Sequence, residues 1–316
     1  MAITETEAVA GLRILVAIAK ADGTIHDEER AALSTALEGV KLPAGTTVDS
    51  LLADTVDVDA ELAVVKGAEA RDDVYKSAYG MAYADGNCSR EEQLLLYRLR
   101  EAWGIPDRQA NFVSRLFAET KDTVLPSNIQ PIEDPAKRAK EIHQDVLKYS
   151  LLSAVLGAFP IPGVAIATDL AIVAVQVKMV RDIGQYHGHK VDKESAKSLL
   201  YGLGLGTGAR IAVNNIVKLV PGWGSAFAAV TSFAATFAVG KVMTKYFADG
   251  KKADLASLKK DFKEAQKEGK AAYAEHKGEV DALEAAQRAK LEQLSADLKD
   301  GKMSLEAYEQ EVAKLG

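Results

Sequence analysis

Two long uncharged stretches in the middle third of the chain restrict its fold more than any other feature. Residues 149–168 and 219–240 each run for about twenty residues without a charged side chain, close to the length of a membrane-spanning helix. Both are broken by turns that contain Pro160, Pro162 and Gly163, and Pro221, Gly222 and Trp223. Proline cannot continue a helix, so each break predicts a turn followed by one long helix, over residues 164–186 and from after Gly224 to about Phe247.

The sequence leaves two environments open for these helices. They either form hairpins that enter a membrane, or they are the buried centre of a large helical bundle. Basic residues flank both stretches on both sides, so charge bias does not select an orientation. Asp169 lies in the second half of the first hairpin. It either pairs with Arg210 or sits at a helix end, or it marks a functional polar site.

A short motif that occurs twice in the first third of the chain indicates an internal duplication. Ala19–Gly23 (AKADG) aligns without a gap on Ala82–Gly86 (AYADG), and an acidic pair follows each copy at the same spacing. In each copy the glycine fits the left-handed position that ends a helix, and the acidic pair falls in the first turn of the next helix. Ser89 and Glu92 have the spacing of a capping box.

The acidic residues of the two copies have two interpretations. They either stabilise helix N-termini, or they form a divalent-cation site in which carboxylates from both copies converge: Asp22, Glu28, Glu29, Asp85, Glu91 and Glu92. A standard EF-hand is excluded, because its early oxygen ligands would fall on Ile18 and Lys20, and on Met81 and Tyr83 in the second copy. A divalent cation is the one cofactor that the sequence suggests.

With this duplicated motif, residues 1–122 resemble the TerB domain of tellurite-resistance and stress-response systems. The resemblance implies a small all-α domain with an acidic, metal-binding surface, and it carries that role to the six acidic residues above. His26 stands where Ser or Thr is commoner, which weakens the helix cap in the first copy.

A proline-rich segment, residues 123–136, cannot continue a helix and is predicted to be a linker. Residues 137–250 then form an apolar helical-hairpin domain. Residues 142–247 within it resemble the uncharacterised domain attached to some bacterial GTPases and found in YcjF-type inner-membrane proteins, which implies membrane association. That resemblance is carried by residues 158–163, Asp169, residues 176–180, Tyr186 and Gly188. No GxxxxGK[ST] phosphate loop is present, so no GTPase is encoded.

The last part of the chain is predicted to be a long charged helix that ends in a short helical hairpin. Residues 251–287 are dense in Lys, Glu and Ala, with apolar residues at three-four spacing. Residues 288–316 resemble the SHOCT module, on the pattern Leu291, Leu294, Leu298, Gly301, Met303, Ser304, Tyr308 and Leu315. That resemblance implies oligomerisation or partner docking, whereas the alternative is a plain solvated helix.

Composition excludes several classes of protein. The net charge of -6, from 39 Lys and Arg against 45 Asp and Glu, argues against a nucleic-acid partner. A single cysteine, Cys88, forbids an intramolecular disulfide and fits a reducing cytosol. His187 and His189 have no acidic residue at ligand spacing and are predicted to lie in a surface loop. The sequence contains no catalytic triad, zincin helix or dinucleotide motif, so we do not expect an enzyme.

The sequence therefore predicts an all-α, non-enzymatic, membrane-associated scaffold or stress-response protein that self-assembles and binds or remodels lipid. It has three parts: a TerB-like bundle with an acidic, metal-binding head, an apolar helical-hairpin domain, and a charged tail. We expect it in the cytoplasm at the inner face of the membrane. Its expected partners are membrane lipid, other copies of the chain, and other proteins that bind the head or the tail. The alternative is a soluble, metal-responsive binding protein of the tellurite-resistance kind.

Overall fold

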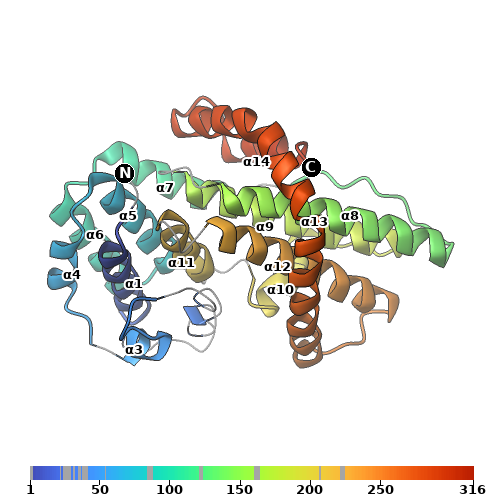
Figure 1. Cartoon of the computed structure of the whole chain (residues 1–316), viewed down its shortest axis with the longest axis horizontal. Helices are drawn as coiled ribbons and strands as arrows, with labels where there is room; N and C mark the ends of the chain where they lie inside the picture. The colour runs from blue at the N-terminus through green and yellow to red at the C-terminus, as the bar shows by residue number, and fades with distance from the viewer. Residues whose placement is uncertain are drawn as a thin grey trace. The chain divides into compact units, whose positions relative to one another are not determined.

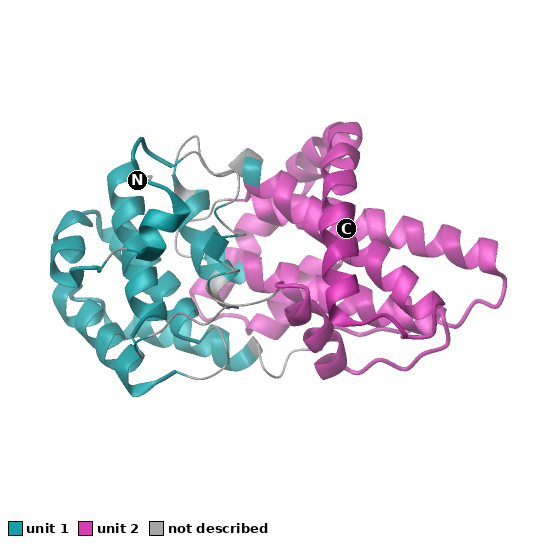
Figure 2. Ribbon diagram, turned by 90° about the horizontal axis from the view of Figure 1, so that it is seen from below, with its two compact units in different colours: residues 1–121, 160–167, 206–227 teal, residues 122–159, 168–205, 228–316 magenta. Residues whose placement is uncertain are grey.

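A computed structural model shows a chain built of α-helices, with no strand among the residues that it describes. Those residues are 3–21, 23, 30, 33–34, 37, 42–53, 55–83, 88–120, 124–159, 164–205, 208–220 and 225–316. The chain divides into two compact units, which Figure 2 colours separately. Unit 1 holds residues 1–121, 160–167 and 206–227, and unit 2 holds residues 122–159, 168–205 and 228–316. The predicted all-α class is confirmed.

Unit 1 is a bundle whose centre is helix α5 (Figure 1). Its helices are α1 (Glu5–Ala19), α3 (Val48–Ala53), α4 (Val58–Val64), α5 (Ala68–Ala82), α6 (Arg90–Trp103), α7 (Asp107–Thr120) and α11 (Gly208–Leu219). α5 packs against α1, α6, α7 and, most extensively, α11. Gly11 permits the close approach of α1, because a Cβ there would lie 2.9 Å from Val74 Cγ2 and 3.1 Å from Ile216 Cδ1.

Helix α11 departs from the predicted division into domains. The sequence places residues 137–250 in one apolar domain, but α11 belongs to the same compact unit as the N-terminal head. Its apolar residues form a stripe at helical spacing, and that stripe is part of the head's core: Ala212, Val213, Ile216, Val217 and Val220. An apolar stripe requires a partner surface but does not specify it, so the spacing alone could not assign α11 to the head.

Helix ends in unit 1 follow the predicted capping chemistry. Glu92 N donates to Ser89 Oγ (3.1 Å), and Ser89 N donates to Glu92 Oε2 (2.7 Å), so the predicted capping box at the start of α6 is present. Gly104 ends α6 in a left-handed conformation, with φ 60°. Gly23 also has a positive φ, 103°, but it is not the cap of the first helix: α1 ends at Ala19, and its C-cap is Lys20, with φ -97°.

Glu7 joins the first helix to the turn before α5. Its Oε2 accepts hydrogen bonds from Thr4 N (3.1 Å) and Thr4 Oγ1 (2.8 Å), and its Oε1 accepts from Lys66 N and Gly67 N (3.0 Å each). Gly67 has no side chain to cap α5, and the Glu7 carboxylate instead binds the two N–H groups just before the helix. Partial burial raises the pKa of Glu7, but the hydrogen bonds outweigh it and lower the pKa to about 2.

Glu7→Gln is expected to destabilise the protein in a pH-dependent way. A depressed carboxyl pKa contributes stability above the ordinary value of 4.5, and this contribution is lost as the pH falls towards 2. The variant should lose about 1 kcal/mol at neutral pH, since solvent weakens the interaction, and the difference should vanish near pH 2. Urea unfolding across this pH range measures both values, with the exposed Glu5→Gln as control. A difference that stays constant with pH would contradict this role.

Unit 2 contains the long helices (Figure 1). These are α8 (Pro135–Ala158), α9 (Ala165–Tyr186) from residue 168, α10 (Lys193–Gly202), α12 (Ser225–Ala248) from residue 228, α13 (Leu255–Lys299) and α14 (Leu305–Ala313). α9 and α12 confirm the two long helices predicted after the proline-glycine breaks. Within the predicted linker, residues 124–134 contain no helix, and Pro135 occupies the first position of α8.

Glycines allow α8, α12 and α13 to pack closely. A Cβ on Gly157 would lie 2.5 Å from Ser232 Oγ, and one on Gly240 would lie 2.5 Å from Val146 Cγ1. A Cβ on Gly269 would lie 2.8 Å from Ala234 Cα. Contacts below 3 Å cannot be accommodated by ordinary van der Waals packing, so each site requires glycine.

Gly240→Val is expected to lower the free energy of unfolding by about 3 kcal/mol, because the added side chain overlaps Val146 in a packed interface. The matched control is Gly278→Ala in α13, where no atom lies within 4 Å of the new Cβ. That change should raise stability by about 0.5–1 kcal/mol, because alanine favours the helix. Chemical denaturation of both variants tests the prediction, which is wrong if they shift stability in the same direction.

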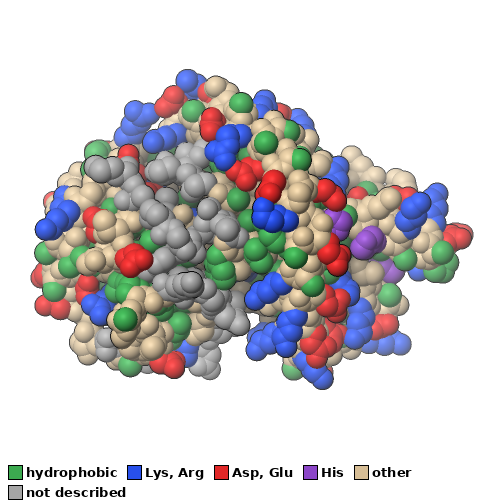
Figure 3. Space-filling view, in the orientation of Figure 1, with side chains coloured by type: hydrophobic (Ala, Val, Ile, Leu, Met, Phe, Trp, Pro, Cys, Tyr) green, Lys and Arg blue, Asp and Glu red, His purple; other side chains and the backbone are tan. Residues whose placement is uncertain are grey.

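The apolar stripe of the charged tail is buried within one copy of the chain. Leu258, Phe262, Leu291, Leu294 and Leu298 are each at most 5% exposed, and α13 packs against α8 and α14. Ser304 caps α14 as predicted, accepting a hydrogen bond from Ala307 N (3.2 Å). Acidic and basic side chains are mixed along the outer side of α13 (Figure 3). The predicted homo-oligomer therefore needs a surface other than this stripe.

Candidate functional site

The predicted cation site lies mostly outside the described residues. Asp22, Glu28, Glu29 and Asp85 are all in the part of the chain that the structure leaves undescribed. Glu91 is exposed at the start of α6, and Glu92 is engaged in the capping box. Among the residues that the structure does describe, no group of three His, Cys, Asp or Glu side chains could hold a metal ion. Helix capping is confirmed for Glu92, and the cation site stays a prediction.

The predicted hairpin residues are described only in part. Pro160, Pro162, Gly163, Pro221, Gly222 and Trp223 lie outside the described residues. Asp169 is buried within α9, with 5% of its surface exposed. The alternatives that the sequence leaves open for it stay predictions. One helix, Phe227–Ala248, is long and apolar enough to cross a membrane, but 67% of its most apolar window is buried by the protein itself. Buried core helices of globular proteins meet the same criteria.

Polar side chains form a buried cluster between α5 and α11 in unit 1, which we name the α5–α11 cluster: Asp72, Asp73, Lys76, Ser77 and Asn215. Asn215 Nδ2 donates to Asp73 O (3.1 Å) and to Ser77 Oγ (2.7 Å), and Ser77 Oγ donates to Asp73 O (2.8 Å). Asn215 is 1% exposed and Ser77 is fully buried. A buried amide with two fixed acceptors admits one register, so Asn215 sets the position of α11 on α5.

A buried ion pair adjoins these contacts. Lys76 Nζ lies 2.5 Å from Asp72 Oδ2, and the same ammonium group faces the ring of Phe112 at 5.5 Å from its centroid. Lys76 is only 3% exposed. Removing Lys76 would leave the Asp72 carboxylate buried without this ion pair, which is costly in a protein interior. This cluster could not be recognised from the sequence, because Lys and Asp four positions apart also form exposed pairs, such as Lys277 and Asp281.

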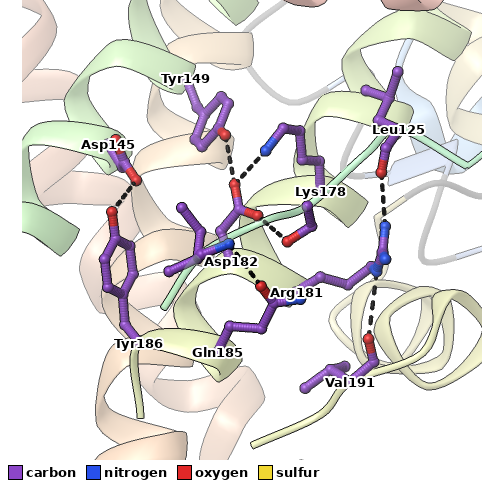
Figure 4. Close-up of polar contacts among 11 residues, drawn as sticks. Leu125, Asp145, Tyr149, Lys178, Arg181, Asp182, Gln185, Tyr186 and Val191 are labelled. Carbon is purple, nitrogen blue, oxygen red and sulfur yellow. Dashed lines mark hydrogen bonds and ion pairs between the residues drawn. The ribbon is translucent and has the colours of Figure 1, made fainter. Parts of the chain in front are cut away.

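A second polar cluster, in unit 2, centres on Asp182 and is shown in Figure 4. Asp182 is 1% exposed, and its Oδ2 accepts hydrogen bonds from Tyr149 OH (2.6 Å) and Lys178 Nζ (2.6 Å). Its Oδ1 accepts a hydrogen bond from the Ser127 hydroxyl. We name Ser127, Tyr149, Lys178 and Asp182 the Asp182 cluster. It joins the linker, α8 and α9, because each of these segments supplies one donor to the Asp182 carboxylate.

Tyr149, in this cluster, and Tyr186, next to it, each donate a hydrogen bond to a carboxylate. Burial raises the pKa of Tyr149, and the facing Asp182 carboxylate raises it further. Burial likewise raises the pKa of Tyr186, whose hydroxyl donates to Asp145 Oδ2 (2.9 Å). Burial also raises the pKa of Asp145, against the hydrogen bond from Tyr186 that lowers it. Both phenols are therefore protonated hydrogen-bond donors near neutral pH, and the arrangement is one of fixed polar pairs.

The linker is held along α9 by further hydrogen bonds from both main chain and side chains. Ile129 N donates to Gln185 Oε1 (3.0 Å), and Ile132 N donates to Tyr186 O (3.1 Å). Arg181 donates to the main-chain oxygens of Leu125 (2.8 Å) and Val191 (3.3 Å), as Figure 4 shows. The predicted linker is thus an extended segment fixed to α9. The sequence identified its prolines but gave no indication of these contacts.

Comparison with known proteins identifies part of the chain. Residues 6–115 match the family model described as tellurite resistance protein TerB. No curated protein matches the chain, and no solved structure matches it. The resemblances drawn for the apolar centre and for residues 288–316 remain predictions. The N-terminal third of the chain is therefore TerB-like, with its helical core completed by α11.

Proposed function

We propose that this protein is a non-enzymatic binding protein of the tellurite-resistance kind. In this proposal the TerB-like head responds to a divalent cation, and the helical unit that follows serves as a scaffold for partner proteins. The match of residues 6–115 to TerB carries the proposal. The buried polar clusters support a structural rather than a catalytic use of the polar residues, because their carboxylates are engaged by lysine, tyrosine and serine donors.

Packing inside unit 2 supports a folded helical scaffold. Gln176 Nε2 donates to Thr236 Oγ1 (2.9 Å) between α9 and α12, and both side chains are buried. Close glycine contacts join α8, α12 and α13. Apolar helices that bury polar side chains against one another are typical of a protein core. We therefore favour the interpretation in which the two uncharged stretches face one another.

Calorimetric titration of the full-length protein with Ca²⁺, Mg²⁺ or Zn²⁺ tests the proposed function. We expect one of these ions to bind, and the triple variant Glu28→Ala/Glu29→Ala/Glu91→Ala to lose the binding. Glu92 is left unchanged because it caps α6. Glu101→Ala, an exposed change farther along the same helix, is the matched control. Absence of binding by all three ions, or equal binding by the triple variant, would refute a cation-responsive head.

Membrane association is the second candidate, and the length and apolar composition of Phe227–Ala248 favour it. In that proposal the protein acts as a scaffold at the inner face of the cytoplasmic membrane and binds or remodels lipid. Flotation with vesicles of phosphatidylethanolamine and phosphatidylglycerol tests it. Protein that floats with the vesicles and resists extraction by salt supports insertion of this helix, whereas protein that stays at the bottom of the gradient contradicts it.

A further inference from the structure

Unit 2 contains a cavity of about 600 Å³ that none of the predicted functions uses. Three elements form its walls: α10, the end of α12 with the connection that follows, and the start of α13 (Figure 1). A volume of this size is within the range of small-molecule sites in proteins, about 300–1,000 Å³. Every residue that lines the cavity belongs to the described part of unit 2.

One wall of the cavity is apolar. Val191, Phe247 and Leu258 line it and are themselves well packed, with 8%, 2% and 4% of their surface exposed. Leu255 also lines the cavity but is 48% exposed, which is unusual for a large aliphatic side chain in this protein. The apolar surface therefore continues from the interior to the mouth, where a hydrocarbon chain would bury it.

The rim of the cavity is positively charged. Lys190 and Lys251 both line it, both are exposed, and neither forms an ion pair with a carboxylate of the described residues. The acidic residue of the lining, Glu194, has Lys197 Nζ at 4.0 Å, so its charge is offset locally. Ser198 adds a hydroxyl group. An apolar wall with two uncompensated ammonium groups at its edge complements an anion that carries an apolar chain.

Lys251 occupies a backbone position that costs the fold stability. Its φ is 67°, and it is the one non-glycine residue with a positive φ among those described. The left-handed conformation costs a residue with a Cβ about 1–2 kcal/mol, a cost that glycine would avoid.

The turn itself needs only the main chain, because Lys251 N donates to Tyr246 O (2.8 Å). Lys251 Nζ lies 5.8 Å from the centroid of the Phe247 ring, which places the ammonium group at the cavity wall. Strain at a residue whose side chain reaches a cavity indicates a functional site.

We propose that this cavity binds a single-chain anionic amphiphile of the fatty-acid class. The carboxylate lies between Lys190 and Lys251, and the hydrocarbon chain lies along Leu199 and Leu255. Two sources would supply this chemistry, a free fatty acid and a fatty acid taken up from a bilayer. The site is separate from the predicted cation site of the head, so it does not depend on the function proposed above.

Isothermal titration of the full-length protein with laurate, below its micelle concentration, tests the site. We expect saturable binding of laurate and none of dodecyltrimethylammonium, which has the same chain and the opposite charge. Lys251→Gly should weaken laurate binding by about tenfold or more, because a charged contact is lost. The same variant should melt about 2 °C higher, because glycine relieves the left-handed strain. A site that is lost while the fold becomes more stable cannot be explained by unfolding.

Three further arms complete the test. Lys251→Arg should retain binding, since it preserves the charge, and Lys260→Gln, an exposed lysine of α13 outside the cavity lining, should leave it unchanged. Laurate presented in phosphatidylcholine vesicles distinguishes uptake from a bilayer from capture of the free anion, and Lys251→Gly should weaken either by about tenfold or more. Equal binding of the anionic and cationic amphiphiles, or full affinity in Lys251→Gly, overturns the proposal.

Discussion

A chain that ends at residue 122 is expected to lack a cooperative unfolding transition, even though it contains the whole TerB-like segment. The head's core includes side chains that arrive much later in the sequence on α11: Val213, Ile216, Val217 and Val220, each at most 2% exposed. Burial of such a side chain contributes about 1.5–3 kcal/mol. Together the four approach the net stability of an ordinary domain, about 5–15 kcal/mol. Thermal melts followed by circular dichroism compare the shortened chain with the full-length protein.

Two additional measurements make this prediction specific to α11. A synthetic peptide of residues 206–227, added to the shortened chain, should restore a cooperative melt. In the full-length protein, Ile216→Ala should cost about 2–5 kcal/mol, because the side chain is fully buried against α1 and α5. The neighbouring Asn214→Ala, at a half-buried position, should change stability by less than about 0.5 kcal/mol. A shortened chain that melts cooperatively near the full-length temperature would show that α11 is dispensable.

Local features of the fold could be predicted from the sequence because their causes are local. Ser89, Glu92 and Ser304 set helix N-termini through hydrogen bonds to residues three positions away. The apolar residues of α11 also lie at helical spacing. The spacing does not show which surface the stripe covers. The predicted domain of residues 137–250 therefore includes α11, although its stripe packs in the head.

The buried polar clusters could not be predicted from the sequence, because the sequence does not show which polar side chains are buried together. Asn215 contacts Asp73 and Ser77 across more than a hundred residues of chain, and a lone asparagine in a helix has no signal for that contact. The leucines of the tail are a second example of burial that the sequence does not show. They suggest a surface for self-assembly, yet the structure buries them within one copy. Periodicity identifies which face is apolar, and only the tertiary structure identifies the partner.

Asp182→Ala is expected to lower the free energy of unfolding by about 3–5 kcal/mol, since it removes one member of a buried ion pair. The change also leaves the hydroxyl groups of Tyr149 and Ser127 without the carboxylate that accepts their hydrogen bonds. Replacing both charges with apolar groups, in Lys178→Met/Asp182→Leu, should recover much of this loss because no buried charge then lacks a partner. Urea denaturation of Lys178→Met, Asp182→Leu and the double variant gives the interaction energy.

The chain supplies a matched control for this prediction in Lys277 and Asp281. Both pairs are a lysine followed by an aspartate four positions later in a helix, with Nζ–Oδ2 distances of 2.6 Å and 2.5 Å. The side chains of Lys178 and Asp182 are 19% and 1% exposed, whereas those of Lys277 and Asp281 are 59% and 56% exposed. Asp281→Ala should therefore cost no more than about 0.5 kcal/mol. If the two aspartate variants lose equal stability, helical spacing accounts for both pairs, and the burial of Asp182 has no energetic consequence.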